Sequence, residues 1–329
     1  MCGIGADGFA DDDTFRVAIR VCAHEMFHAW NVRRLGPAPF LDLENRLHTG
    51  CFTEGLWVAE GFTRYYEFVT CTNTGVYSAE QFFSNIVGYH DHLTRLPSYE
   101  RVSALESSLA VYLNNSPAYP GQASNIIDYY DKGMLIAFGL DAVLRMESST
   151  NLNEAFGAFF HEFVHWPNTP LQELGYTTEQ VIDYFDGTPP GLEARLTREA
   201  RQPSGLDTLE LLRRLGFAVT TASVSYMGLV FTDDSNTISG TFDRAPAVMC
   251  GLARGDVIEM INGYPCSRDA LVWVTGQTRR LSNFDVATLS SQTLPSTGSI
   301  SIPLSIASRS FVTSTEICCR DRALISPSR

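Results

Sequence analysis

Two histidines and a glutamate near the N-terminus form the clearest chemical pattern in this sequence of 329 residues. They are His24, Glu25 and His28, in the order His-Glu-x-x-His. On an α-helix, side chains four positions apart lie about one turn from each other on the same face, so both imidazoles can reach one metal ion. Glu25 lies beside them and can accept a proton from a water molecule on that ion. The pattern therefore predicts a metal site with hydrolytic chemistry.

A second helix must supply a third ligand, because catalytic zinc usually takes three protein ligands and leaves one position for water. Residues 56–67 offer one. If they are helical, Glu60, Thr63 and Glu67 share a face, so that Glu60 can bind the ion and Glu67 can hydrogen-bond a ligating imidazole. Glu54 is a competing third ligand, although we prefer Glu60 because it lies inside the predicted helix. The alternative is an ordinary amphipathic helix with solvated acids.

A second His-Glu-x-x-His run occurs at His161, Glu162 and His165. No helix bearing a suitable glutamate follows it, because Pro167 ends the helix before Glu173. We interpret this run as a structural helix with surface or partly buried histidines, and its role stays open. The motif is short enough to occur by chance in ordinary helices.

The residues around the first motif resemble the glycyl aminopeptidase family of zinc peptidases, which are of the gluzincin type. The similar stretches are 24–37, HEMFHAWNVRRLGP, and 56–66, LWVAEGFTRYY. The resemblance implies one Zn²⁺ ion per chain, with Glu25 as the general base. It also implies three zinc ligands, which are His24, His28 and Glu60. Thermolysin places a carboxylate four residues after its ligand glutamate, where this chain has Arg64, so we assign the imidazole-binding role to Glu67 instead.

A third stretch, residues 128–133, is similar to the Tyr-x-Lys-Gly element of related aminopeptidases and implies that Tyr130 steadies the oxyanion of the transition state. The expected reaction is aminopeptidase cleavage of peptides that begin with glycine or alanine, in which water activated by Glu25 attacks a zinc-polarised carbonyl. Members of the family carry a Gly-Gly-Leu-Glu-His element before the zinc helix, and this sequence has none. We therefore expect an N-terminally truncated catalytic domain with weak or no turnover of glycyl substrates.

The composition excludes some classes of partner. With 24 basic and 37 acidic residues the net charge is −13, which leaves no surplus of positive charge to meet the phosphates of a nucleic acid. No apolar run is long enough to span a membrane and no signal peptide is recognisable, which favours a cytoplasmic location. The eight cysteines contain no C-x-x-C pair, so we expect free thiols, with Cys22 packed in the interior.

The elements that must position these residues predict an α+β fold: a mainly α-helical, thermolysin-like catalytic lobe followed by a small β-rich domain. We expect the first helix to run from near Thr14 to the prolines at 37 and 39, and a loop over 107–125. Gly61 costs about 1 kcal/mol in a helix relative to alanine, which indicates a close approach of two helices there. The turn-rich stretch 187–205 divides a catalytic domain, 1–195, from a second domain, 206–329.

The second domain resembles a PDZ domain in two stretches, 226–231 and 244–263. Such a domain binds an extended peptide at a sheet edge and holds its terminal carboxylate with backbone N–H groups. The predicted peptide-binding residues are Gly228, Leu229, Val230 and Phe231. The alternative for this domain is a β-rich lid that binds nothing. The alternative function for the whole chain is a catalytically weak or inactive protein that binds peptides through the PDZ-like domain.

Overall fold

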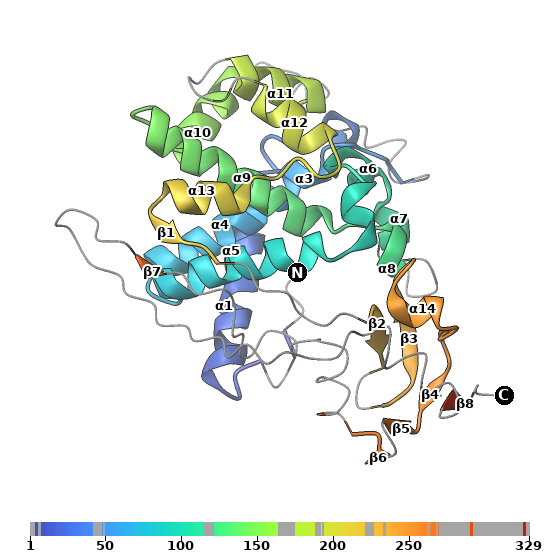
Figure 1. Ribbon diagram of the computed structural model, residues 1–329. Helices are drawn as coiled ribbons and strands as arrows, with labels where there is room; N and C mark the ends of the chain where they lie inside the picture. The colour runs from blue at the N-terminus through green and yellow to red at the C-terminus, as the bar shows by residue number, and fades with distance from the viewer. Residues whose placement is uncertain are drawn as a thin grey trace.

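The protein is mostly helical, with a few short strands toward its C-terminal end (Figure 1). The structure is a computed structural model that describes residues 4–5, 8–41, 48, 50–114, 122–163, 175–187, 192, 194–220, 227–232, 235–261, 264–267, 269, 290–291 and 325–326. The longer helices are α1 (Asp12–Phe27), α4 (Gly61–Asn73), α5 (Ala79–Thr94), α9 (Tyr129–Glu147), α10 (Leu152–Phe163) and α11 (Thr178–Gly187). The shorter ones are α3 (Leu56–Ala59), α6 (Ala104–Leu109), α7 (Val111–Asn114), α8 (Gln122–Asn125), α12 (Arg195–Arg201), α13 (Thr208–Arg214) and α14 (Pro246–Met249).

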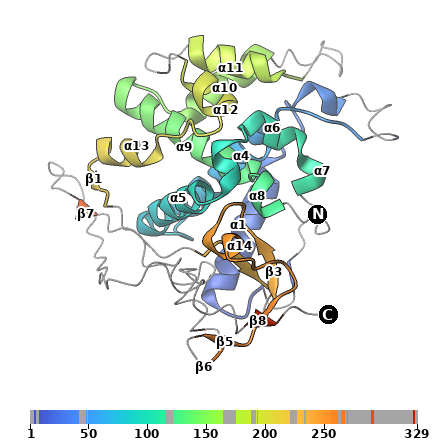
Figure 2. The ribbon, with the colours of Figure 1, turned by 45° about the vertical axis from the view of Figure 1, so that its right-hand side comes forward.

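Helix α9 is the centre of the larger core. It is buried from Tyr129 to Leu144 apart from the half-buried Tyr130, because apolar residues occupy most of its sides. It packs against α3, α4 and α5, and Figure 2 shows α4 and α5 beside it. The closest approach joins Gly61 of α4 to Gly133 of α9, where a Cβ on either residue would clash with the backbone opposite. The close approach expected at Gly61 is thus confirmed.

Helix α1 begins as predicted but ends early. Asp11 and Thr14 form a reciprocal capping box at its start. The helix ends at Phe27 rather than continuing to Pro37, and residues 28–34 form tight turns instead. His28 still has helical backbone angles, with φ −59° and ψ −15°, so it stays one turn beyond His24.

The predictions for the middle of the chain have mixed outcomes. Ser78 and Gln81 form the expected capping box at the start of α5. The expected loop over 107–125 is wrong, because a second capping box between Ser103 and Glu106 opens α6 and a short helix, α7, follows it. Residues 115–121 lie outside the described residues. Among the described helices, none combines the length and apolar character needed to pass through a bilayer.

A smaller core lies in the C-terminal part and contains Met227, Leu229, Ile238, Ala247, Cys250, Leu252 and Ile258. The strands there pair antiparallel, two by two. The pairs are β1 (Phe217–Ala218) with β7 (Ser290–Ser291), β2 (Leu229–Phe231) with β3 (Ile238–Thr241), β4 (Val257–Ile258) with β8 (Ile325–Ser326), and β5 (Met260–Ile261) with β6 (Tyr264–Pro265). Helix α13 and strand β1 pack against the larger core, although they follow residue 206, where the second domain is predicted to begin. The domain boundary stays a prediction.

Candidate metal centre

Three side chains from two packed segments converge on one point. His24 and His28 project from the end of α1, and Glu60 lies at the junction of α3 and α4, which packs against α1. The Nε2 atoms of the two histidines are 3.1 Å apart. Glu60 Oε2 lies 3.1 Å from His24 Nε2 and 3.2 Å from His28 Nε2. Glu60 does not lie inside one continuous helix as expected, but between two helices with φ −103°. Among the described residues, these three alone form such a group of metal-binding side chains.

The Nδ1 atom of each imidazole forms a hydrogen bond on the side away from the three converging atoms. His24 Nδ1 lies 2.7 Å from Glu67 Oε2, and His28 Nδ1 lies 3.1 Å from the backbone oxygen of Asn31. Because a carboxylate and a carbonyl oxygen can only accept, each Nδ1 carries the proton and donates it. In the neutral imidazoles both Nε2 lone pairs therefore point toward Glu60 and toward each other.

The electrostatics of these groups require a positive species between them. Burial alone would lower the pKa of His24, but hydrogen bonds to Glu60 and Glu67 outweigh it and raise that pKa to about 9. Burial alone would raise the pKa of Glu60, but hydrogen bonds from both histidines lower it to about 2. Three acceptor atoms this close repel one another unless a proton or a cation lies among them.

The donor set fits zinc. Two imidazole nitrogens and one carboxylate oxygen are the ligand types of many catalytic zinc sites. Tetrahedral coordination at about 2.0–2.1 Å places neighbouring ligand atoms about 3.3–3.4 Å apart. The observed separations of 3.1, 3.1 and 3.2 Å are close to this spacing. Three ligands also leave a fourth position for water or substrate.

The two residues predicted to act on substrate come from α1 and from α9. Glu25 follows His24 in α1 and is exposed to solvent. Tyr130 comes from the start of α9, and its ring centroid lies 5.9 Å from that of His24. Burial and the nearby Glu60 carboxylate raise the pKa of Tyr130 well above its usual value, so its hydroxyl stays protonated and can donate a hydrogen bond.

Two arginines that sequence reasoning missed surround the site. Arg20 pairs with Glu67 at 3.1 Å and lies over the ring of Phe68 at 4.8 Å. Arg64 pairs with Asp131 at 3.0 Å. Arg20 could have been found from its spacing, because it lies four residues before His24 on the same helix and must face the same helix α4.

Other predicted residues lie elsewhere. Glu54, the competing ligand, is exposed and is not part of the group of three. His161 and Glu162 are exposed on α10, while His165 lies outside the described residues.

Cys22 is exposed, which corrects the expectation that it packs in the interior. The described thiols at 71 and 266 are free, as expected.

The predicted peptide-binding residues lie at and just before β2. Gly228 has a φ of +69°, in the region that glycine tolerates best, and leads directly into the strand. Leu229 is buried in the smaller core, and Phe231 packs against that core. Val230 is half-buried and pairs with Gly240 of β3. The use of these residues in binding a peptide stays a prediction.

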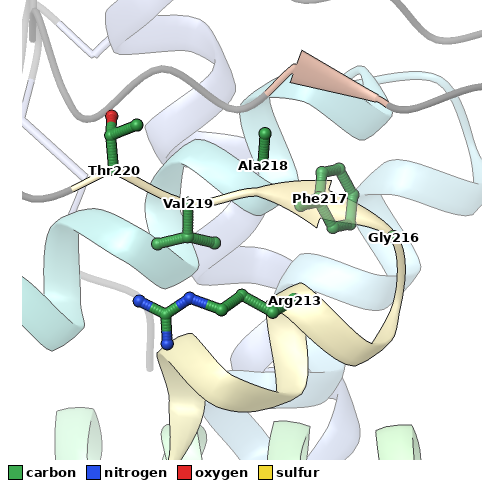
Figure 3. A pocket seen from close by; sticks show the side chains of 6 residues that line it. All are labelled: Arg213, Gly216, Phe217, Ala218, Val219 and Thr220. Atoms are coloured by element: carbon green, nitrogen blue, oxygen red, sulfur yellow. The ribbon is translucent and has the colours of Figure 1, made fainter.

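A separate hollow lies between α13 and β1 (Figure 3). Its lining residues are Arg213, Gly216, Phe217, Ala218, Val219 and Thr220. Arg213 is the one charged side chain among them, and it pairs with Glu210. This lining holds no acid and base that could act together.

The two histidines and the carboxylate at the α3–α4 junction have the residue types and spacing expected of a His-Glu-x-x-His metal site. The family model of the M61 glycyl aminopeptidase matches residues 17–136, which include all three of these side chains. No curated protein matches this chain.

Among solved structures, an aminopeptidase N family protein from Idiomarina loihiensis is similar, with a TM-score of 0.69 and 23% sequence identity. The similarity covers 79% of this chain and 46% of that chain, so the matched region is less than half of the length of that protein. The structural likeness shows the fold. The family match supports a peptidase function.

Proposed function

We propose that this chain is a zinc-dependent peptidase with His24, His28 and Glu60 as its ligands. The observation that supports it most is the convergence of three acceptor atoms within 3.2 Å of one another, with both imidazoles held by their far nitrogens. A structural core rarely collects three lone-pair donors without a partner, because their mutual repulsion and desolvation cost free energy.

The residues divide the work of peptide hydrolysis among them. Bound zinc would polarise the peptide carbonyl and make water more acidic. Glu25, exposed next to His24, accepts the proton from the attacking water and passes it to the leaving amine. Tyr130, whose pKa is raised by burial, donates a hydrogen bond to the oxygen that becomes negative in the transition state. Glu67 keeps His24 oriented throughout.

Two variants test this proposal. Glu25→Gln should lose turnover while one zinc per chain is retained, because Glu25 is not a ligand. Glu60→Ala should lose both zinc and turnover. Metal analysis after dialysis, together with hydrolysis of a peptide mixture, measures both. A Glu60→Ala protein that binds zinc with the same affinity as wild type would contradict the proposal.

The proposed substrates are peptides with a free N-terminal glycine or alanine, as the resemblance implies. A pair of peptides with the same sequence, one free and one acetylated at its N-terminus, tests the preference. An aminopeptidase cleaves only the free peptide, whereas equal cleavage of both would identify an endopeptidase.

Peptide binding at β2 is a second proposed activity. It is supported by the positive φ of Gly228, which turns the backbone just before a short strand whose Leu229 anchors it in the smaller core. The N–H groups of such a turn can hold a carboxylate. Calorimetric titration with peptides that end in a free or an amidated C-terminus tests it, and equal or absent binding of both contradicts it.

A further inference from the structure

Asn31 connects two of the three proposed ligands, His28 and Glu60. It follows His28 by three residues and is fully buried. Its backbone oxygen accepts the hydrogen bond from His28 Nδ1 at 3.1 Å. The main chain of Asn31 therefore sets the direction in which the His28 ring faces.

The side chain of Asn31 reaches the opposite segment, on both sides of Glu60. Its Nδ2 donates to the backbone oxygen of Val58 at 3.0 Å and of Ala59 at 3.1 Å, and lies 3.0 Å from Thr63 Oγ1. Helix α3 ends at Ala59, so its last carbonyl groups need partners from outside the helix. Asn31 supplies such a partner at the point where the backbone bends to present Glu60.

The surroundings fix the orientation of this amide. Thr63 Oγ1 donates to the Ala59 oxygen at 2.7 Å, which leaves its lone pairs free to accept from Asn31. With nitrogen and oxygen exchanged, the amide oxygen would face two carbonyl oxygens, which repel it. The nitrogen, with two hydrogens to donate, therefore faces these three acceptor atoms.

The neighbouring residue shows that this turn is held under strain. Val32 has a φ of +107°, which is unfavourable for a β-branched residue. Such backbone strain costs about 1–3 kcal/mol and persists only where the surroundings impose it. Val32 N donates to the Leu35 oxygen at 2.9 Å, which closes the turn that brings Asn31 back to the site.

We propose that Asn31 is a positioning residue that fixes the distance between His28 and Glu60. This inference rests on the proposed function, because it concerns the same metal site. The main chain of Asn31 orients His28, and its side chain holds the helix junction that carries Glu60.

The test is the affinity for Zn²⁺ and Co²⁺ by competition with a chelator. Asn31→Asp keeps the shape of the side chain but removes its N–H donors, and should weaken binding by about 10–100-fold. The visible absorption spectrum of the Co²⁺-loaded variant should change as well, because the ligands are displaced; a purely structural loss would leave that spectrum as it is. Asn85→Ala is the matched control, since Asn85 also donates to a backbone oxygen but lies on α5.

A second pair of variants covers the case in which Asn31→Asp does not fold. Thr63→Val should weaken metal binding, and Thr63→Ser, which keeps the hydroxyl, should restore it. Equal metal affinity and equal spectra for wild type and variants would overturn the inference while the proposed function stands. A wild-type protein that binds no metal would instead refute the proposed function.

Discussion

Replacement of Glu67 by glutamine tests how the site is supported. The Glu67 side chain is buried, accepts a hydrogen bond from His24 Nδ1 at 2.7 Å and forms an ion pair with Arg20 Nη1 at 3.1 Å. Glutamine has nearly the same shape but carries no charge. The change therefore leaves the packing intact and removes the electrostatic support of the His24 ligand.

Two magnitudes follow from this geometry. Loss of a carboxylate behind a ligating imidazole lowers metal affinity about 10–100-fold, or about 1.4–2.7 kcal/mol. Breaking a buried ion pair costs about 3–5 kcal/mol of stability when the remaining charge has no other partner. Arg20 keeps some solvent exposure and its contact with Phe68, so we expect the lower end, about 3 kcal/mol.

Chelator competition measures the affinity, and urea unfolding of the metal-free protein measures the stability. Glu54→Gln is the control, because Glu54 is exposed and lies outside the group of three ligands. An unchanged metal affinity in Glu67→Gln would refute the reasoning that Glu67 orients His24.

Three further predictions concern catalysis and the core. Glu25→Gln should lower kcat by about 10²–10⁴-fold and Tyr130→Phe by about 10²–10³-fold, both with zinc retained in metal analysis. Gly61→Ala should destabilise the fold by about 1–3 kcal/mol in urea unfolding, because its Cβ would clash with Gly133; unaltered stability would contradict the close approach. Lys132→Met should cost about 1–3 kcal/mol in the same assay, since the buried Lys132 Nζ donates to three backbone oxygens; a neutral effect would show that they find other partners.

Helical spacing allowed the candidate site to be predicted from sequence. The positions of His24 and His28 on one face, and of Glu60 and Glu67 on another, depend only on local geometry. The close approach at Gly61 could also be predicted, because glycine is unfavourable in a helix unless a neighbouring backbone leaves no room for a Cβ. Their roles in metal binding and catalysis stay predictions.

Features that depend on distant contacts could not be predicted. Helix α1 ends before its expected stop because Asn31 bonds to residues about thirty positions later in the chain, which no local pattern reveals. Helix α6, in contrast, could have been predicted, because the capping box between Ser103 and Glu106 is a local signal just before the polar stretch. The packing of α13 against α9 could not be predicted either, because this contact joins distant parts of the sequence.

The most direct test of the central claim is the anomalous scattering of zinc in crystals of the zinc-loaded protein. The account predicts one zinc per chain, about 2.0–2.2 Å from the Nε2 atoms of His24 and His28 and from an oxygen of Glu60. A zinc ion bound elsewhere, or no zinc at these three side chains, would contradict it.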